Sequence, residues 1–488
     1  MNIIHLILTS TLHVPRRVLA NVALAAAMLG AAPIVSLGQS AEDDSLLATA
    51  VFATRHAALN GRLYFAADNG VNGNELWVSD GTAAGTFMLK DIASGASASD
   101  PDCLTVVGNR IFFSAKSGTN AGLWITDGTA AGTVLLRNFP GTASIPRFLA
   151  AAGNLCYFAG TESATGMEPW MSDGTAAGTR LVADLKPGTA SSAPLYFTNV
   201  DGTVFFAAEA STTTTTGKGK KKSTVTTSTG VELWKTNGTA AGTVLVKDIA
   251  PGSNHSLPTN LFAWNGALYF SAHFPNAGNE LMRSDGTAAG TVLVKDLVSG
   301  SMSSNPRGFR THAGKLLFNA HGSNSGIWQT DGTAAGTVPA NVLPGVPGFV
   351  YSDFVVLGTR IVARAETGGG LQLWSTDGAT STQLFTLNPA DGFPEAFLGT
   401  MQFGNRLLFT ALTHELGFDL YITDGTAAGT ALVKDFQPGA NSVPEPLFLG
   451  PVQNGVLLTA ADGPSGHELH ITNGTTAGTV IVTDIQPD

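Results

Sequence analysis

The sequence predicts an all-β protein, a β-propeller built from nine four-stranded antiparallel repeats of about 47 residues. Three observations support this fold class. A heptapeptide, Asp-Gly-Thr-Ala-Ala-Gly-Thr or a variant of it, recurs along almost the whole 488-residue chain. Successive copies lie 46 to 49 residues apart, with one gap of 64. Charged residues make up only 13%, while 58 glycines and frequent Val, Thr, Phe and Leu suit short strands with tight turns.

The heptapeptide begins with a short acidic or amide side chain in every copy. These residues are Asp80, Asp127, Asp173, Asn237, Asp285, Asp331, Asp377, Asp424 and Asn473. Asn keeps the side-chain acceptor and the tolerance of left-handed backbone but carries no charge, so the exchange would damage a calcium or acid–base role. We expect Gly81 and Gly85 to supply positive φ. The heptapeptide is therefore interpreted as a structural Asx turn.

The fifth repeat shows how one unit is built. Residues 261–264 and 267–272 are apolar runs joined by Asn-Gly, the strongest short hairpin signal. Residues 280–284 and 292–297 are joined by the heptapeptide, and no run has a helical period. A four-stranded sheet that is apolar on both faces must stack on its neighbours, as propeller blades do. Nine blades exceed the usual four to eight, and we expect a single enlarged ring, with two smaller rings as the alternative.

Residues 1–40 read as a separate signal peptide with cleavage near 38–41, followed by the propeller over 41–488. Arg16 and Arg17 precede a run of small apolar residues, and an uncleaved membrane anchor is the alternative. We therefore expect a protein secreted to the periplasm, the cell surface or the medium, with no membrane segment after cleavage. The formal charge of -10 argues against nucleic acid as a partner.

Two stretches also resemble a known family. Residues 75–92, "ELWVSDGTAAGTFMLKDI", and 232–253, "ELWKTNGTAAGTVLVKDIAPGS", are similar to the ELWxxDGT repeat of secreted bacterial proteins, sometimes labelled hyalin-like. The resemblance covers about 51–488 and implies an exported, propeller-like protein with no established reaction. The seventh unit, at Asp377, departs from the pattern because it lacks the second glycine.

The loops between second and third strands vary, and variable loops on a rigid scaffold usually carry binding residues. The residue that ends the second strand is polar in most repeats, and six of these residues are candidate ligand-binding groups: Asp68, Lys116, Glu209, His273, His321 and Glu366. Glu209, His273, His321 and Glu366 form an arc that reads either as a metal or acid–base cluster or as exposed strand ends. His414 and His467 extend the same rim.

An insertion at about 210–230, rich in Thr and Lys, reads as a disordered protruding loop, and Lys218 and Lys220 to Lys222 could touch an anionic surface. Cys103 and Cys156 read as small core residues, and their pairing stays open. The "ELW" tryptophans read as core. No catalytic motif, metal motif or cofactor signature occurs.

These observations favour a secreted, non-catalytic and monomeric binding or surface-interaction module whose ligand is an extracellular glycan or protein. Two alternatives stay open: an exported polysaccharide hydrolase or lyase that uses the Glu/His arc, and a structural component of an extracellular matrix.

Overall fold

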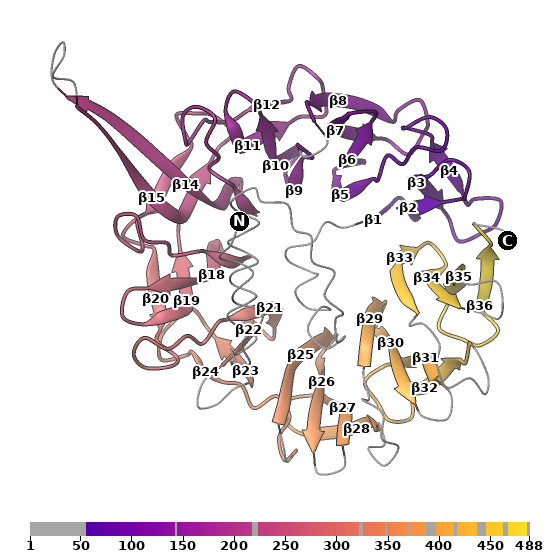
Figure 1. The fold of residues 1–488 in the computed structure, drawn as a ribbon. Coiled ribbons are helices and arrows are strands. Elements are labelled where there is room, and N and C mark those ends of the chain that lie inside the picture. The colour runs from indigo at the N-terminus through magenta and orange to yellow at the C-terminus, as the bar shows by residue number, and fades with distance from the viewer. Residues whose placement is uncertain are drawn as a thin grey trace, which may run out of the picture. The chain divides into compact units, whose positions relative to one another are not determined.

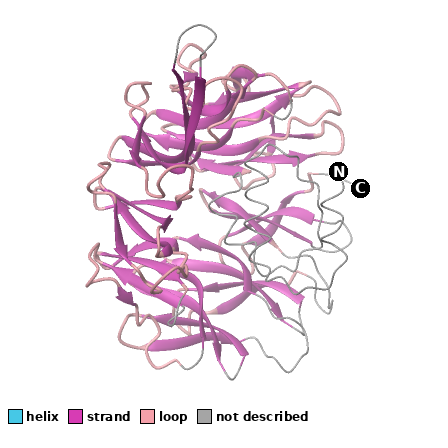
Figure 2. Cartoon of the chain, turned by 60° about the vertical axis from the view of Figure 1, so that its left-hand side comes forward, coloured by secondary structure: helices cyan, strands magenta, loops and turns pink. Residues whose placement is uncertain are grey.

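The computed structural model describes residues 55–141, 144–216, 223–321, 326–346, 349–367, 370–386, 397–413, 417–436, 446–461 and 467–485. All of these belong to one compact unit, Glu42–Asp488. The predicted signal peptide, the four lysines of the insertion and His414 lie outside the described residues. The described chain consists of strands and loops (Figure 2), and it contains no helix with the length and apolar character needed to cross a membrane.

The repeat prediction is confirmed, because the described chain forms nine four-stranded antiparallel sheets, each made of four consecutive strands. The first three blades contain β1 (His56–Leu59), β2 (Arg62–Asp68), β3 (Asn74–Ser79), β4 (Phe87–Lys90), β5 (Asp102–Val107), β6 (Arg110–Ser117), β7 (Asn120–Thr126), β8 (Val134–Phe139), β9 (Arg147–Ala152), β10 (Leu155–Glu162), β11 (Gly166–Ser172) and β12 (Arg180–Leu181). The next three contain β13 (Leu195–Val200), β14 (Thr203–Thr216), β15 (Ser223–Thr236), β16 (Val244–Lys247), β17 (Thr259–Trp264), β18 (Ala267–Phe274), β19 (Gly278–Ser284), β20 (Val292–Lys295), β21 (Arg307–His312), β22 (Lys315–Ala320), β23 (Gly326–Thr330) and β24 (Val338–Pro339). The last three contain β25 (Phe349–Leu357), β26 (Arg360–Thr367), β27 (Gly370–Thr376), β28 (Ser381–Thr386), β29 (Phe397–Phe403), β30 (Arg406–Thr413), β31 (Gly417–Thr423), β32 (Ala431–Lys434), β33 (Leu447–Val452), β34 (Gly455–Ala461), β35 (His467–Thr472) and β36 (Thr479–Thr483).

The nine blades form one ring, as expected, with the first strand of each blade nearest the centre and the fourth at the outside (Figure 1). The ring closes where the ninth blade meets the first. Gln453 donates its backbone N–H to the carbonyl oxygen of Gly61 at 2.9 Å. Beside this bond, Leu63 and Phe65 pack against Leu457 of the ninth blade. The described terminal sheets exchange no strand, so closure depends on packing between complete blades.

Each blade buries its two apolar faces against its neighbours. Between the first and second blades, Leu76 packs with Phe113 and Trp124 in one cluster. The tryptophan of the repeat fills this core as expected, with an exposed fraction of 8% at Trp124. Cys103 and Cys156 are also buried, and the structure leaves both thiols unpaired. Burial raises the pKa of the Cys103 thiol to about 11, as expected for an inert core residue.

The ring has two unlike faces. We call the face that carries the turns between strands one and two and between strands three and four the turn face. The loops between strands two and three and the connections between blades form the opposite side, the loop face.

The heptapeptide forms the same hydrogen-bonded turn in most blades. The Asp80 Oδ1 atom accepts bonds from the N–H of Thr82 at 2.9 Å and from its hydroxyl at 2.7 Å. Asn237 makes the same two bonds through Oδ1, at 3.1 and 2.7 Å. The turn therefore uses the acceptor oxygen, which both residues have. In the seventh blade Asp377 instead accepts from the N–H groups of Ala379 and Thr380.

The two glycines of the heptapeptide have different roles. Gly81 has φ of 90°, as expected, and a Cβ there would lie 2.5 Å from Cδ1 of Ile471 in the ninth blade. The expectation of positive φ is wrong for Gly85, which is not among the left-handed residues. A Cβ on Gly85 would lie 2.0 Å from Oδ1 of Asp80, so this glycine leaves room for the carboxylate.

Lysines at the end of the fourth strand join neighbouring blades on the turn face. The Lys90 ammonium donates to the carbonyl oxygen of Thr133 at 2.7 Å, in the next blade's heptapeptide. The ammonium of Lys247 donates to the carbonyl oxygen of Thr291 at 2.7 Å in the same way. The heptapeptide thus forms a turn and also supplies a carbonyl acceptor for the lysine of the neighbouring blade, which gives a further reason for its constancy.

A second repeated anchor lies on the loop face and was not predicted. The glutamate of "ELW" points into the connection that leads to the next blade. Glu232 is fully buried and accepts from the N–H groups of Ile249 at 2.9 Å, Ala250 at 3.3 Å and Ser256 at 3.0 Å, and from the Ser256 hydroxyl at 2.6 Å. We call this arrangement the carboxyl anchor. The same bond from a serine hydroxyl is present at Glu75, Glu168 and Glu280.

Burial changes the protonation of these anchors. It raises the pKa of Glu232 from 4.5 to about 7, although hydrogen bonds from Ser256 and the amides of the connection act in the opposite direction. Burial likewise raises the pKa of Glu168 to about 7. Glu168 and Glu232 therefore titrate near neutral pH.

We expect Gly81→Val to destabilise the protein by about 2 kcal/mol or more, because a β-branched residue would have to adopt positive φ and displace Ile471. Asp80→Asn should change the free energy of unfolding by less than about 0.5 kcal/mol, since Asn237 already makes the same turn. Chemical denaturation of both variants measures the difference. Equal, large losses from both would contradict a turn role for Asp80.

Glu232→Ala should cost about 3 kcal/mol or more, because it leaves the buried amides of Ile249 and Ala250 without their acceptor. Asp248→Asn in the same connection is the matched control. Within the described chain the side chain of Asp248 accepts one hydrogen bond, from the N–H of Gly252 at 3.1 Å, and Asn keeps an acceptor. Denaturation midpoints compare the two, and a stable Glu232→Ala protein would refute the anchor.

Between about pH 5 and pH 8 we expect thermal stability to fall. The folded protein holds the protons of Glu168 and Glu232 up to about pH 7, whereas the unfolded chain releases them near 4.5. The folded state thus binds more protons in this window, so raising the pH favours unfolding. Burial lowers the pKa of His56, so this one residue makes stability rise with pH and opposes the effect of the two glutamates.

Melting temperature against pH measures this effect, and Glu232→Gln should flatten the slope. A melting temperature that rises steadily from pH 5 to pH 8 would contradict it.

Candidate functional site

On the loop face, a backbone hydrogen bond joins the second strand of several blades to the connection that precedes the blade. The N–H groups of Lys116, Glu209, His273 and His321 donate to the carbonyl oxygens of Ser99, Ser192, Ser256 and Ser304, at 2.7, 2.9, 2.7 and 2.6 Å. Each serine precedes a left-handed residue and a proline, as in Ser256-Leu257-Pro258, where φ of Leu257 is 47°. These four predicted site residues therefore occupy one structural position, repeated in four blades.

Most of these side chains are held by partners in their own neighbourhood. The Lys116 ammonium lies 2.7 Å from Oδ2 of Asp100. An Nε2–Nη1 distance of 2.7 Å joins His321 to Arg307. Asp68 accepts from the N–H of Gly70 at 2.8 Å, within its own loop.

The arc of acids and histidines is not drawn together into a metal centre in the described chain. The structure describes no group of three or more His, Cys, Asp or Glu residues able to hold a metal ion there. Glu366 lies one residue before the end of β26, not at its end as predicted, and its side chain lies outside the described residues. His467 begins β35, with its side chain likewise outside them.

Glu209 is the most firmly held member of the arc. Its carboxylate lies 2.8 Å from the ammonium of Lys186 and accepts from the hydroxyl of Ser228 at 2.6 Å. Burial acts to raise the pKa of Glu209, but the bonds from Lys186 and Ser228 outweigh it and lower the pKa. Glu209 is thus an ionised structural group and does not suit the role of a general acid.

His273 differs from the rest because its side chain is exposed and has no side-chain partner among the described residues. It lines a shallow groove with a volume of about 470 Å³ on the loop face. One wall is the connection between the fourth and fifth blades, and the other is the loop between β18 and β19. The lining residues are Ala250, Ser253, Asn254, His255, His273, Pro275 and Asn276.

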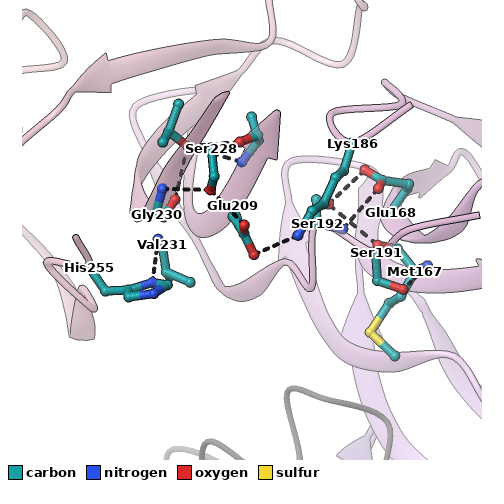
Figure 3. A network of polar contacts seen from close by, with 12 residues as sticks. Met167, Glu168, Lys186, Ser191, Ser192, Glu209, Ser228, Gly230, Val231 and His255 are labelled. Carbon is teal, nitrogen blue, oxygen red and sulfur yellow. Dashed lines mark hydrogen bonds and ion pairs between the residues drawn. The ribbon is translucent and has the colours of Figure 1, made fainter. Parts of the chain in front are cut away.

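A polar network positions the first wall of this groove (Figure 3). His255 accepts the N–H of Val231 through Nδ1 at 2.9 Å, so a neutral ring carries its proton on Nε2. Gly230 lets the wall approach, because a Cβ there would lie 1.7 Å from the carbonyl oxygen of Asn254. The carboxyl anchor of Glu232 holds the same connection at Ala250 and Ser256.

The groove offers hydrogen bonds without formal charge. Asn254 and Asn276 bring amide groups, Ser253 brings a hydroxyl, and the two histidines bring ring nitrogens. Pro275 adds an apolar surface. This set can bind a polar, neutral ligand along an open surface, and it holds no pairing of a nucleophile with a base.

Reasoning from the sequence identified His273 but missed His255. A signal was present, because His255 stands where three other connections have Ala98, Ser191 and Ser303. Both serines accept the same type of bond: Ser191 accepts it from the N–H of Met167 and Ser303 from the N–H of Asn279, each at 2.9 Å. His255 thus keeps the structural bond and adds an imidazole ring to the surface.

Neither a protein-family model nor a curated protein matches the chain. Solved structures resemble it at low identity. The computationally designed Ika8 protein has 15% identity and a TM-score of 0.40, with 78% of this chain and 96% of that chain covered. Puromycin hydrolase has 14% identity and a TM-score of 0.35, and the match covers 80% of this chain but only 61% of the hydrolase. The β-propeller domain of the Trilobed protease from Pyrococcus furiosus has 10% identity and a TM-score of 0.34, with 69% and 96% covered. The activities in these names belong to those proteins, and the chain itself is a β-propeller module.

Proposed function

We propose that this protein is an exported, non-catalytic binding module that takes a glycan on the loop face of its propeller. The observation that carries the proposal is the groove between the connection 250–255 and the loop 273–276. In that groove His273, alone among the arc residues with described side chains, has no side-chain partner in the described chain.

The contrast between the two faces supports this assignment. On the turn face, Asp80 and its equivalents bond to their own turn, and lysines such as Lys90 fill the adjacent carbonyl sockets. The polar groups of these turns are therefore already bonded to other parts of the fold. On the loop face the connection carrying His255 is anchored by Glu232, so its exposed side chains are presented by a fixed backbone.

The chemistry of the lining favours a sugar. Neutral amides, a hydroxyl and imidazole nitrogens match the alternating donors and acceptors of a carbohydrate. Pro275 can contact the apolar face of a pyranose ring. The groove is open at the surface and suits a short stretch of a longer chain better than an enclosed small molecule. A protein loop is the other ligand class, and the binding experiment below includes it.

A polysaccharide-cleaving enzyme is the competing class, and the geometry supports it less. The hydrolases of this class use two carboxyl groups on either side of the scissile bond, one of them protonated. Glu209 is held by Lys186 with a lowered pKa, which disfavours the protonated form.

We expect His273→Ala to weaken glycan binding at least about tenfold, because it removes the ring from one wall of the groove. The mature protein is first applied to an array of bacterial and plant glycans and to immobilised extracellular proteins. The strongest soluble glycan is then titrated by calorimetry against the wild type and the variant.

His312→Ala is the matched control, since His312 ends β21 on the turn face. It should bind within about twofold of the wild type. Equal affinities for all three proteins would refute the groove, and release of reducing sugar ends from the bound glycan would establish the enzyme instead.

A further inference from the structure

The fourth blade carries an arm that has no equivalent in the other described blades. Its strands β14 and β15 have 14 residues each and project beyond the ring (Figures 1 and 2). Beyond the blade they pair only with each other, from Ser211–Ser228 to Thr216–Ser223. At about 3.4 Å per residue this free part is about 17 Å long. The expected protruding loop is therefore a regular two-stranded ribbon over its described part.

The base of the arm is rigidly attached. Lys186 and Ser228 bind Glu209 where the arm leaves the blade (Figure 3). The neighbouring strands stop there, because β13 reaches only Ala207 and β16 reaches only Leu233. Beyond Ser211, no described strand pairs with the outer edge of β14 or of β15.

The direction of the free backbone groups follows from one bond. The N–H of Ser211 donates to the carbonyl oxygen of Leu185 at 3.2 Å, so it points away from β15. Directions alternate along a strand, and therefore the N–H and C=O groups of Thr213 and Thr215 point the same way. These two residues form no bond to a neighbouring strand within the described chain.

The free edge of β14 lacks the features that natural edges use against pairing. Residues 211–216 are one Ser and five Thr, with no charge, proline or bulge after Ser211. Threonine has high β-propensity, and a two-stranded ribbon gains stability from further strands.

We propose that the edge of β14 is a self-association site, which pairs antiparallel with the same edge of a second copy. The two-fold axis passes through Thr214, and Thr213 of each copy exchanges two backbone bonds with Thr215 of the other. This is the register that uses the free groups of both copies while leaving the bond of Ser211 intact.

Charge selects a second copy in this orientation. The segment between the two strands carries Lys218 and Lys220 to Lys222, while the whole chain has 36 acidic and 26 basic residues. A parallel pair would place the lysines of both copies together. The antiparallel pair avoids this repulsion between like charges.

This proposal replaces our expectation of a monomer and is independent of the groove. With four backbone bonds the association is weak and depends on concentration. It presents two grooves together, which would raise avidity for a repetitive ligand.

Sedimentation equilibrium of the mature protein from about 10 μM to about 1 mM tests the pairing. We expect a monomer–dimer equilibrium. Thr215→Pro removes an N–H donor that faces the second copy and should weaken dimerisation at least about tenfold. Thr224→Pro is the matched control. Thr224 lies directly opposite Thr215 in the arm and points its N–H to the other edge, so dimerisation should change less than about twofold.

A cross-linking experiment covers the case in which proline disturbs the arm. Thr214→Cys places two thiols on the two-fold axis, and mild oxidation should yield a covalent dimer. Val225→Cys, across the arm from Thr214, should cross-link at least about tenfold more slowly. A monomer at all concentrations would overturn the proposal. So would equal effects of the two prolines together with equal cross-linking of the two cysteines.

Discussion

The loop face depends on one buried contact, the carboxyl anchor that joins the third strand of a blade to the connection behind it. Glu232 gathers the amides at both ends of one connection, which are separated by only seven residues in sequence, and closes that segment into a fixed loop. The loop then presents its serine carbonyl to the next blade, where His273 binds it. A single carboxyl group thereby sets the geometry within a blade and between blades, and both walls of the groove depend on it.

The anchors also explain where the unusual features of the ring are found. The third, fourth and fifth blades carry Glu168, Glu232 and Glu280 in succession, each bonded to its own serine. The second and sixth blades have Gly122 and Gly326 at this position and lack the group. The groove and the arm both lie within the continuous stretch of anchored blades, where the backbone that supports them is most constrained.

The fold could be predicted because its determinants are local. Asn-Gly and the heptapeptide are turn signals within a few residues, and their period defines the blade before any contact is known. The anchor could not be recognised in this way, since Glu232 and Ser256 are 24 residues apart and either is unremarkable alone. For Gly85 the expected reason was wrong, because its role is steric and involves Asp80. His273 was identified from its place near a strand end. His255 could not be found in this way, because its role depends on a bond to the N–H of Val231, 24 residues away.

The eighth blade has a shorter acid at the position of the carboxyl anchor. Asp419 replaces glutamate there and is one methylene shorter. It is fully buried, and neither of its carboxylate oxygens has a hydrogen-bond partner within the described chain, from which residues 437–445 of its connection are missing. Burial, with Asp435 nearby, raises the pKa of Asp419 to about 7, as burial does at Glu168 and Glu232. The repeat therefore keeps a buried carboxylic acid at this position with either side-chain length. In the third to fifth blades, which carry the groove and the arm, this acid is glutamate, and each one accepts a hydrogen bond from the serine of its own connection.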